Sequence, residues 1–348
     1  MIEVDGSVYS GSGTLLRYAV ALATILGESL HMIRIRARRD KPGLRPQHLQ
    51  ALKSCCALSG GRLEGAEVGS QEIRYQPGNS LRHGDYRWDI GTAGSTSMLA
   101  FTLIPIALYA KGPCRFFITG GLFQDFAPSA FHLQKVLIPL LVRMGGEVKL
   151  KILRPGYVPM GQGQLELEIH PMSGPLTPLE MTEQGKMKEI CGISLASHLE
   201  KEKVSERMAS QCQKLLAARG FTARIEIQKD QTACQRGAAL FLRAESDQGC
   251  LLGADQSGRP GRRSEAIAEY VVNSLFQDLE TKATADRHLA DQLILFAALA
   301  AGLTQYRIPM VTDHIEANLW LAGKVLGVRS ELQGNRLRIE GIGRARNG

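Results

Sequence analysis

Two distant stretches of the chain follow one pattern, and this recurrence constrains the fold more than any other feature. Residues 48–68 (HLQALKSCCALSGGRLEGAEV) and 132–152 (HLQKVLIPLLVRMGGEVKLKI) both begin with HLQ, continue as an apolar-periodic helix, stop at Gly-Gly and turn into a strand. A glycine pair is typical of a helix C-terminus, where one residue adopts a left-handed conformation. A third, weaker copy covers residues 314–341. The recurrence predicts repeated α/β units, each with a helix laid on a sheet.

Residues 183–276 interrupt this pattern. They read as a strand, a charged helix, two strands, a loop at 253–264 and a further helix, which is enough for a small α/β domain of its own. We therefore expect an α/β fold with an inserted domain. The expected division is a first body segment at 1–182, the insert at 183–276, a last body segment at 277–341 and a flexible tail at 342–348.

Two further segments predict single elements. Residues 32–38 (MIRIRAR) alternate as a strand would, with Arg34, Arg36 and Arg38 on one face. Residues 284–303 form a strongly apolar pattern, which predicts a buried helix.

Charge, cysteines and apolar runs narrow the class of protein. Lys and Arg exceed Asp and Glu by eight (42 against 34), which permits a polyanionic partner. Seven cysteines without CxxC spacing predict a reduced, cytoplasmic chain, with no catalytic role for Cys191, Cys212 or Cys234. The longest apolar stretch, residues 98–110, is too short to cross a bilayer and contains Pro105, so we expect a buried helix and no membrane span. The N-terminal residues carry no secretory pattern.

The first candidate site is the glycine-bearing loop near the N-terminus. Gly11 and Gly13 precede a helical pattern, so backbone N–H groups at a helix start could face an anion, and Arg17 lies one turn further on. The loop matches neither GxxxxGK[ST] nor GxGxxG, so a plain strand-to-helix turn stays open. Six cationic residues then crowd into 34–45, and this cluster fits a solvated face as well as a phosphate site.

Two later segments hold the other candidates. His288, Asp291 and Gln292 share one helix face, which suits either a contact within the fold or a site that orients a ribose or a metal. In TDHIEAN (312–318), Thr312 or Asp313 is the expected N-cap, and His314 then lies in the first helical turn. A histidine there is either structural or, facing an anion, a nucleophile toward phosphorus.

Together these stretches resemble the RNA 3'-terminal phosphate cyclase family. The inserted domain matches mainly in position and size, whereas the body matches in order and spacing. The matching body segments are DG…GxGxxLR (5–17), RIRARRDKPGLRPQHL (34–49), DIGTAGST (89–96), the GG…D..APSAF run (120–131), PGYVPMGQG (155–163), LADQLILFAALAAG (289–302) and TDHIEANL (312–319).

The resemblance implies a fold and a reaction. The fold is a body of three repeated α/β units, similar to those of the enolpyruvyl transferases, with a small α/β insert. The reaction is that of a ligase-class enzyme acting on RNA 3'-phosphate ends. A histidine takes AMP from ATP, AMP moves to the RNA 3'-phosphate, and the neighbouring 2'-hydroxyl closes a 2',3'-cyclic phosphate and releases AMP. Mg²⁺ or Mn²⁺ is the expected metal.

The resemblance also implies a role for each candidate residue. His314 is the catalytic nucleophile. The nucleotide-binding residues are Arg17, Gln47, Pro128, His288, Asp291 and Gln292, with Pro128 as a wall against the adenine. The residues for phosphates or the RNA end are Arg36, Arg39 and His48.

Three positions depart from the family pattern. Ser10 stands where the family's GEGGGQ loop has a glutamate that helps to bind the metal, Phe101 where the family has a glutamine, and His288 where it often has a tyrosine. The metal ligands and the oligomeric state therefore stay unassigned. The alternatives left open are a paralogue that adenylylates a different phosphorylated end, a non-catalytic RNA-binding relative and an enolpyruvyl-transferase-like enzyme. The presence of His314 favours the cyclase.

Overall fold

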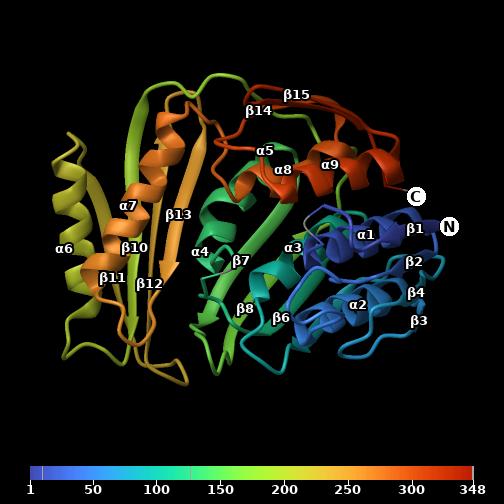
Figure 1. Ribbon diagram of the computed structural model, residues 1–348, viewed down its shortest axis with the longest axis horizontal. Coiled ribbons are helices and arrows are strands. Elements are labelled where there is room, and N and C mark those ends of the chain that lie inside the picture. The colour runs from blue at the N-terminus through green and yellow to red at the C-terminus, as the bar shows by residue number, and fades with distance from the viewer. Residues whose placement is uncertain (10, 126, 347–348) are drawn as a thin grey trace.

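The computed structural model describes residues 1–9, 11–125 and 127–346, and over these residues the predicted α/β fold class is confirmed. The described chain forms four four-stranded sheets. Three of them belong to the body and one to the insert, which occupies the left side of Figure 1. Ser10, the position that departs from the family's metal loop, lies outside the described residues.

The first body sheet has two parallel strands followed by an antiparallel pair. β1 (Ile2–Asp5) runs parallel to β2 (Leu30–Ile33) across α1 (Gly13–Leu26). A parallel pair needs such a crossover, whereas an antiparallel pair needs only a turn. The elements that follow are α2 (Pro46–Ser59), β3 (Arg62–Glu64) and β4 (Ile73–Gln76), and the strand order is β1-β2-β4-β3.

The other two body sheets have the same order of elements and the same strand order, with the first two strands parallel. The second unit consists of β5 (Gly84–Asp89), α3 (Thr96–Leu108), β6 (Cys114–Gly120), α4 (Ala130–His132), a π-helical segment (Leu133–Leu137), α5 (Ile138–Arg143), β7 (Glu147–Arg154) and β8 (Gly163–His170). The third consists of β9 (Glu180–Met181), α8 (Leu289–Leu299), β14 (Ala301–Arg307), α9 (Asp313–Leu326), β15 (Arg329–Gln333) and β16 (Arg336–Ile342).

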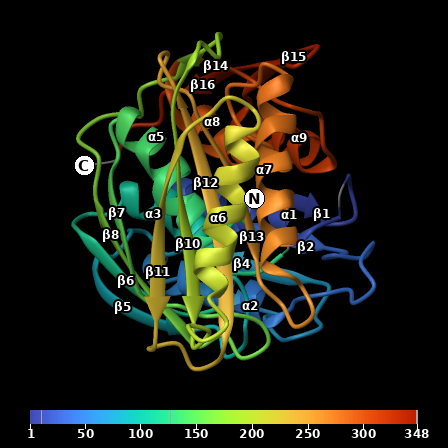
Figure 2. The same cartoon turned by 90° about the vertical axis from the view of Figure 1, so that its left-hand side faces the viewer.

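The insert enters the third unit between β9 and α8. Its elements are β10 (Met187–Ser197), α6 (Val204–Ala217), β11 (Ala223–Asp230), β12 (Gly237–Ser246), β13 (Leu251–Ser257) and α7 (Ser264–Glu280). The strand order is β11-β10-β12-β13, and α6 and α7 pack on each other and on the sheet (Figure 2). β13 is an edge strand, and it is the strand of the insert that contacts α4 of the body. α7 continues past residue 276, where we expected the insert to end.

The helices between the body sheets form the core that holds the site. α1 is buried along nearly its whole length, because α2, α3 and α9 all pack against it. α3 is the buried helix expected around Pro105, and its residues from Leu99 to Leu108 are all buried. Such close packing fixes the starts of these helices relative to one another.

The predicted strand at 32–38 is wrong beyond Ile33. β2 ends there, since β1, its partner in the sheet, also ends at Asp5. The chain then turns through left-handed conformations, with φ of 51° at Arg34 and 54° at Arg36. The arginines of this segment therefore project from a turn, and they do not share one face of a strand.

Two further boundaries differ from the sequence predictions. The loop expected from residue 253 begins as strand β13, because its residues pair along β12, with Phe241 opposite Asp255. The apolar helix expected over 284–303 covers only 289–299, and β14 begins at Ala301. Residues 301–303 (AGL) continue the apolar run of α8, so apolar composition alone could not show where the helix ends.

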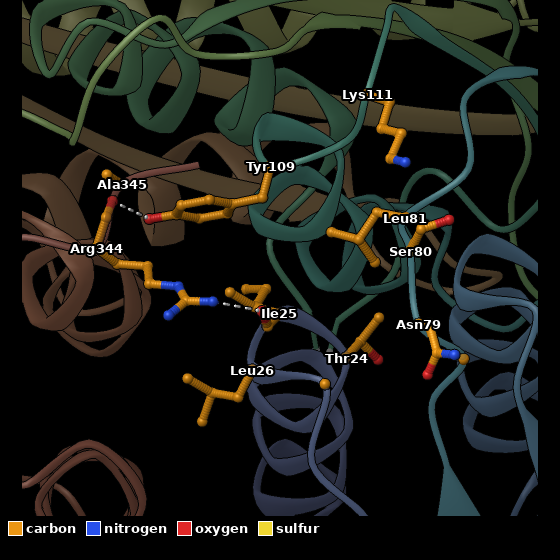
Figure 3. A pocket seen from close by; sticks show the side chains of 12 residues that line it. Thr24, Ile25, Leu26, Asn79, Ser80, Leu81, Tyr109, Lys111, Arg344 and Ala345 are labelled. Atoms are coloured by element: carbon orange, nitrogen blue, oxygen red, sulfur yellow. Dashed lines mark hydrogen bonds between the residues drawn. The ribbon is translucent and has the colours of Figure 1, made fainter. Parts of the chain in front are cut away.

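The chain after β16 is partly held against the body, although we expected a flexible tail from residue 342. Gly343 N–H donates to the carbonyl of Ala300 and Arg344 N–H to that of Leu299. Figure 3 shows Arg344 between Tyr109, whose hydroxyl donates to the Arg344 carbonyl (3.1 Å), and the Ile25 carbonyl (3.3 Å). Residues 347 and 348 lie outside the described part. None of the described helices is both long and apolar enough to cross a membrane.

Candidate functional site

All ten residues proposed for the site line one cavity of about 480 Å³, which we call the central cavity. It lies where the starts of α1, α8 and α9 meet the loop before α2 and the loop before α4. The ten residues are Arg17, Arg36, Arg39, Gln47, His48, Pro128, His288, Asp291, Gln292 and His314. Whether each one has its expected role is a separate matter, which the geometry of the side chains addresses.

Two helix starts meet at His314. Thr312 is the N-cap of α9 and accepts from the Ile315 N–H at 3.3 Å, so His314 lies in the first turn as predicted. Ser12 is the N-cap of α1 and accepts from the Thr14 N–H at 3.2 Å. Its Oγ lies 3.3 Å from His314 Nδ1. Burial, reinforced by the charges of Arg17 and Arg39, lowers the pKa of His314, and the imidazole is therefore neutral near pH 7.

His48 is a second neutral imidazole, and its tautomer follows from one hydrogen bond. The Arg45 N–H donates to His48 Nδ1 at 3.2 Å, which leaves the proton on Nε2. Burial and then the charges of Arg17 and Arg36 hold its pKa well below the usual value. An ideal Cβ on Gly13 would lie 2.1 Å from His48 Nε2, so only glycine fits at this position.

Arg17 supplies positive charge to the interior of the cavity. It is 7% exposed, and its Nη2 contacts Thr14 Oγ1 at 3.2 Å and Met98 Sδ at 3.5 Å. Its Nε has no hydrogen-bond partner within the described part of the chain. Burial lowers its pKa to about 10, which still leaves it charged. A buried guanidinium with an open N–H donor is suited to an anion.

Asp291 and Gln292 place two polar side chains in the first turn of α8, which is otherwise apolar. Burial raises the pKa of Asp291 to about 7, even though the Arg17 charge opposes this. Gln292 is buried, and its Oε1 has no hydrogen-bond partner among the described residues. The Asp291 carbonyl accepts from the Tyr18 hydroxyl at 2.8 Å, which ties α8 to α1. The amide oxygen of Gln292 is therefore available to a ligand that offers hydroxyl or amine donors, and Asp291 lines the cavity beside it.

Arg36 and Arg39 reach the cavity from the turn that follows β2. Arg36 Nη1 donates to the carbonyls of Lys41 and Gly43, both at 2.8 Å, so this guanidinium also braces its own loop. Burial and the charges of Arg39 and Arg45 lower its pKa. This part of the cationic cluster is thus built from a turn with fixed internal contacts.

Gln47 and Pro128 position neighbouring loops. Gln47 Oε1 accepts from the backbone N–H of Ser95, the N-cap of α3, at 3.0 Å. The carbonyl of Pro128 accepts from the Ser97 hydroxyl at 2.6 Å. Pro128 therefore lines the cavity from a segment whose backbone is held by α3.

His288 belongs to a buried network that joins the body to the insert. Asp286 accepts from His132 Nε2 (3.0 Å), from the backbone N–H groups of His288 and Leu289 (2.9 Å each) and from that of Gly253 in β13 (2.8 Å). The Asp286 carboxylate raises the pKa of His132 although burial opposes it, and burial together with the His132 charge lowers that of His288. His132 and Asp286 are both fully buried.

One face of β13 makes two further contacts to the cavity wall. The Ser129 N–H donates to Asp255 Oδ2 at 2.8 Å, and Ser257 Oγ donates to Asp125 Oδ1 at 3.0 Å. Arg262, just beyond β13, binds both carboxylate oxygens of Asp125, at 2.7 and 2.8 Å. The insert therefore holds the loop that carries Asp125 and Pro128.

Sequence reasoning missed Ser12 and Asp125. Ser12 follows Gly11 directly before the helical pattern, and its N-cap signal was available in the sequence. Asp125 is the aspartate of the matching GG…D..APSAF run, but nothing in that run indicates its partner Arg262, which lies in the insert.

The described residues do not fit the expected divalent metal. They contain no group of three or more His, Cys, Asp or Glu side chains that could hold an ion. Of the carboxylates in the described lining, Asp125 is paired with Arg262 and Asp291 has a raised pKa. Mg²⁺ is usually held by one or two ionised carboxylates together with substrate phosphates and water, and neither of these two carboxylates is both ionised and unpaired.

A second cavity, of about 350 Å³, lies at the opposite end of α1 (Figure 3). Thr24, Tyr109, Lys111 and Arg344 are among its lining residues, and none of the ten proposed site residues is. The candidate site is therefore the central cavity at the start of α1.

Comparison with known proteins gives one consistent match. A family model described as RNA 3'-terminal phosphate cyclase matches residues 8–332. A curated relative with that name from Pyrobaculum neutrophilum is 33% identical over 346 residues, covering 98% of this chain and 99% of the relative. One from Methylococcus capsulatus is 34% identical over 330 residues, covering 93% and 91%. One from Archaeoglobus fulgidus is 35% identical over 343 residues, covering 98% and 100%.

Proposed function

Because this chain belongs to the RNA 3'-terminal phosphate cyclase family, we propose that it is a ligase-class enzyme that uses ATP to convert an RNA 3'-terminal phosphate to a 2',3'-cyclic phosphate. The observation that carries the proposal is a neutral histidine, His314, placed at a helix start beside a buried arginine in a cavity of sufficient size. The proposed site of action is the cytoplasm, on RNA ends that carry a phosphate.

His314 acts as the nucleophile in the proposed first step. Ser12 Oγ already accepts from the Thr14 N–H, and it can accept from His314 Nδ1–H as well. That arrangement leaves the lone pair on Nε2. Nε2 attacks the α-phosphorus of ATP, the new N–P bond forms, and the bond to pyrophosphate breaks. The imidazole needs no deprotonation, because its lowered pKa keeps it neutral.

Positive charge and N–H donors then stabilise the phosphates. Arg17 has an open Nε–H, and His48 offers Nε2–H, so both can bind the oxygens of the transferred group. Arg36 and Arg39 would hold the phosphates of ATP or the RNA end. In the second step an RNA 3'-phosphate oxygen attacks the histidine-bound phosphorus and His314 leaves. In the third, the 2'-hydroxyl attacks the RNA phosphate, its proton is lost, and AMP leaves.

The remaining residues would orient the nucleoside. Pro128 would pack against the adenine, while Gln292 Oε1 and the Asp291 carboxylate would accept from ribose hydroxyls or the adenine amine. Gln47 would keep the start of α3 in place, and His288 would lie beside the base. No step is derived through a metal, because the described residues do not fit one.

Labelling with ATP that carries a radioactive α-phosphate tests this proposal. Native protein should acquire an acid-labile label with Mg²⁺ or Mn²⁺, and His314→Ala should lose about a thousandfold or more of the labelling rate. His170→Ala is the matched control, because His170 lies on β8, outside the central cavity, and bonds to Glu168 at 2.9 Å.

Absence of label on folded native protein would reject the nucleotidyl transfer. The lack of an acidic metal group in the described residues would then favour the non-catalytic alternative, in which the same arginines bind RNA without turnover. Salt-sensitive RNA binding by the unlabelled protein is the observation that would support that alternative.

A further inference from the structure

A further cavity, distinct from the central cavity and from the one in Figure 3, lies between the insert and the body. We propose that it binds the single-stranded RNA segment that precedes the 3'-terminal phosphate. We call it the junction cavity. It has a volume of about 750 Å³ and is bounded by the body loop at 157–159, by the loop at 258–263 and by the start of α7. The proposal rests on the proposed function, since it assumes that the RNA end occupies the central cavity.

The two cavities are neighbours on either side of one ion pair. Asp125 lines the central cavity, and Arg262, which binds both oxygens of its carboxylate, lines the junction cavity. A strand whose 3'-phosphate lies near His314 must leave the central cavity through a neighbouring opening. The Asp125–Arg262 pair marks the point at which the preceding nucleotides would enter the junction cavity.

The charge of the junction cavity fits an RNA backbone. Five arginines line it, against a single carboxylate, Glu202, among the described lining residues. Arg236 is 72% exposed and lies 3.7 Å from Glu202, and Arg259 is 68% exposed and lies 4.0 Å from Asp125, so both guanidinium groups are open to solvent. Arg263 is also exposed. Arg207 and Arg262 are held more closely, at 2.9 Å from Glu265 and 2.7 Å from Asp125. Exposed arginines along a groove are the usual electrostatic track for a single strand.

Apolar side chains lie between these charges. Val158, which is 55% exposed, and Pro159 form the body wall, and Leu199 belongs to the wall of the insert. Single-stranded nucleic acid presents flat bases as well as phosphates, and sequence-tolerant sites combine a cationic track with side chains on which bases stack, most often aromatic ones. Here aliphatic side chains would supply the apolar surface for the bases. A cavity that was only charged, or only apolar, would match this ligand less well.

Both walls are fixed before any ligand arrives. Gln235 of the insert donates from Nε2 to the Val158 carbonyl (2.8 Å) and accepts at Oε1 from the Met160 N–H (3.0 Å). The Tyr157 hydroxyl lies 2.8 Å from Ser197 Oγ of β10. Binding therefore needs little ordering of the protein, which favours affinity for a flexible strand.

The test compares RNA of two lengths in direct binding. The probes are a fluorescent twelve-nucleotide RNA with a 3'-phosphate and, as a competitor, a dinucleotide with the same end. The variant is Arg236→Ala/Arg259→Ala/Arg263→Ala. Its matched control is Arg62→Ala/Arg74→Ala/Arg329→Ala, because these three arginines are exposed and line neither cavity. Arg74 and Arg236 each lie 3.7 Å from one glutamate.

We expect the cavity variant to bind the long RNA about tenfold more weakly and the dinucleotide within about twofold of the native value. The slope of log K against log salt for the long RNA should fall by about 2, since each phosphate contact to a single strand contributes about 0.7. The control variant should match the native protein in both measurements.

Three results would overturn the proposal. One is equal binding of the long RNA by the cavity and control variants. Another is an equal loss for both RNA lengths, which would place these arginines at the 3' end itself. The third is displacement of the long RNA by an acidic peptide as readily as by unlabelled RNA, which would indicate a protein partner. Binding needs no turnover, so a native protein that binds the long RNA but takes no label from ATP rejects the proposed reaction alone.

Discussion

The central and junction cavities both contain arginines, yet they differ in how those charges are held. In the central cavity Arg17 is buried beside two histidines whose pKa values are lowered by burial and by neighbouring arginines. In the junction cavity Arg236 and Arg259 extend into solvent from loops. The first arrangement fixes the charge and the protonation state of particular atoms, as catalysis of phosphoryl transfer requires. The second suits binding of single-stranded RNA of variable sequence.

The difference follows from the elements that carry each site. The residues of the central cavity lie at helix starts that are packed against one another. A substitution that displaces one side chain there therefore displaces its neighbours as well. Loops and a strand edge supply the junction cavity, and their side chains act more independently. Substitutions in the first region should therefore have large effects on chemistry, and substitutions in the second should have smaller, additive effects on binding.

The largest expected effect comes from the network that joins the two regions. Asp286→Asn removes the buried carboxylate that holds His132 and three backbone N–H groups, which should lower the free energy of unfolding by about 3–5 kcal/mol. Urea denaturation measures this. Asp85→Asn, an exposed change on β5, is the control and should be neutral. A loss below about 1 kcal/mol would mean that this network does not hold the insert firmly to the body.

The next effect tests the packing of the helix starts. Gly13→Ala places a methyl group where His48 Nε2 lies, so either the imidazole or α1 must move. A displacement of about 1 Å at a reacting centre can lower a rate about a hundredfold, and we expect that loss in labelling by ATP. Gly174→Ala, where an added Cβ meets nothing within 4 Å, should retain full activity. Equal labelling by the two variants would contradict the view that the central cavity depends on close packing of its helix starts.

A smaller effect tests the partition between the cavities. Arg262→Ala removes the main cationic partner of Asp125, whose pKa is lowered chiefly by its hydrogen bond to Arg262, at the wall of the central cavity, and leaves Arg259 at 4.0 Å. The less compensated negative charge should weaken ATP binding about tenfold, or about 1.4 kcal/mol. Calorimetric measurement of ATP affinity for Arg262→Ala and for Arg262→Ala/Asp125→Asn separates the effect of the Asp125 charge from the effect of the loop position. The double variant should regain most of the affinity, and failure to do so would show that the ion pair acts through loop position.

The smallest effect is a shift in pH dependence. A lowered pKa keeps His314 neutral at pH 7, so the labelling rate at saturating ATP should fall only as the pH drops below the usual histidine value of about 6.5. Burial is the main cause and Arg39 contributes. Arg39→Ala should therefore move the acid limb to higher pH. Arg38→Ala is the neighbouring control, since Arg38 binds the Tyr9 carbonyl. An unchanged limb in Arg39→Ala would contradict the electrostatic account of the central cavity.

The sequence predicted those parts of the site whose signals are local. Thr312 and His314 were placed correctly, because an N-cap and a first helical turn depend on adjacent residues. Arg36 lines the expected cavity, but the strand that was predicted to carry it does not extend so far, because β2 ends at Ile33, opposite the end of β1. Alternation of side chains cannot reveal where pairing stops.

What the sequence did not predict is how the insert is attached. Gly253, Asp255 and Ser257 alternate along β13 and bond to two segments of the body, the one that holds Asp286 and the loop before α4. Each contact joins residues far apart in the chain, and Gly253 and Asp255 had suggested a loop. The Asp125–Arg262 pair has the same origin, as neither residue has a local pattern that identifies its partner.

The position of the insert also affects the order in which the chain folds. In the first sheet Ile2 pairs with Leu30, and in the second Gly84 pairs with Cys114, so each parallel pair forms from nearby sequence. In the third sheet Glu180 pairs with Gln305 across the entire insert. During synthesis β9 therefore waits unpaired until β14 leaves the ribosome. The entropy of closing so long a loop grows only slowly with its length, so this delay costs time more than stability. The segment that carries His314 is added after that, so the residues of the central cavity are all present only when the chain has reached α9, with β15 and β16 still to follow.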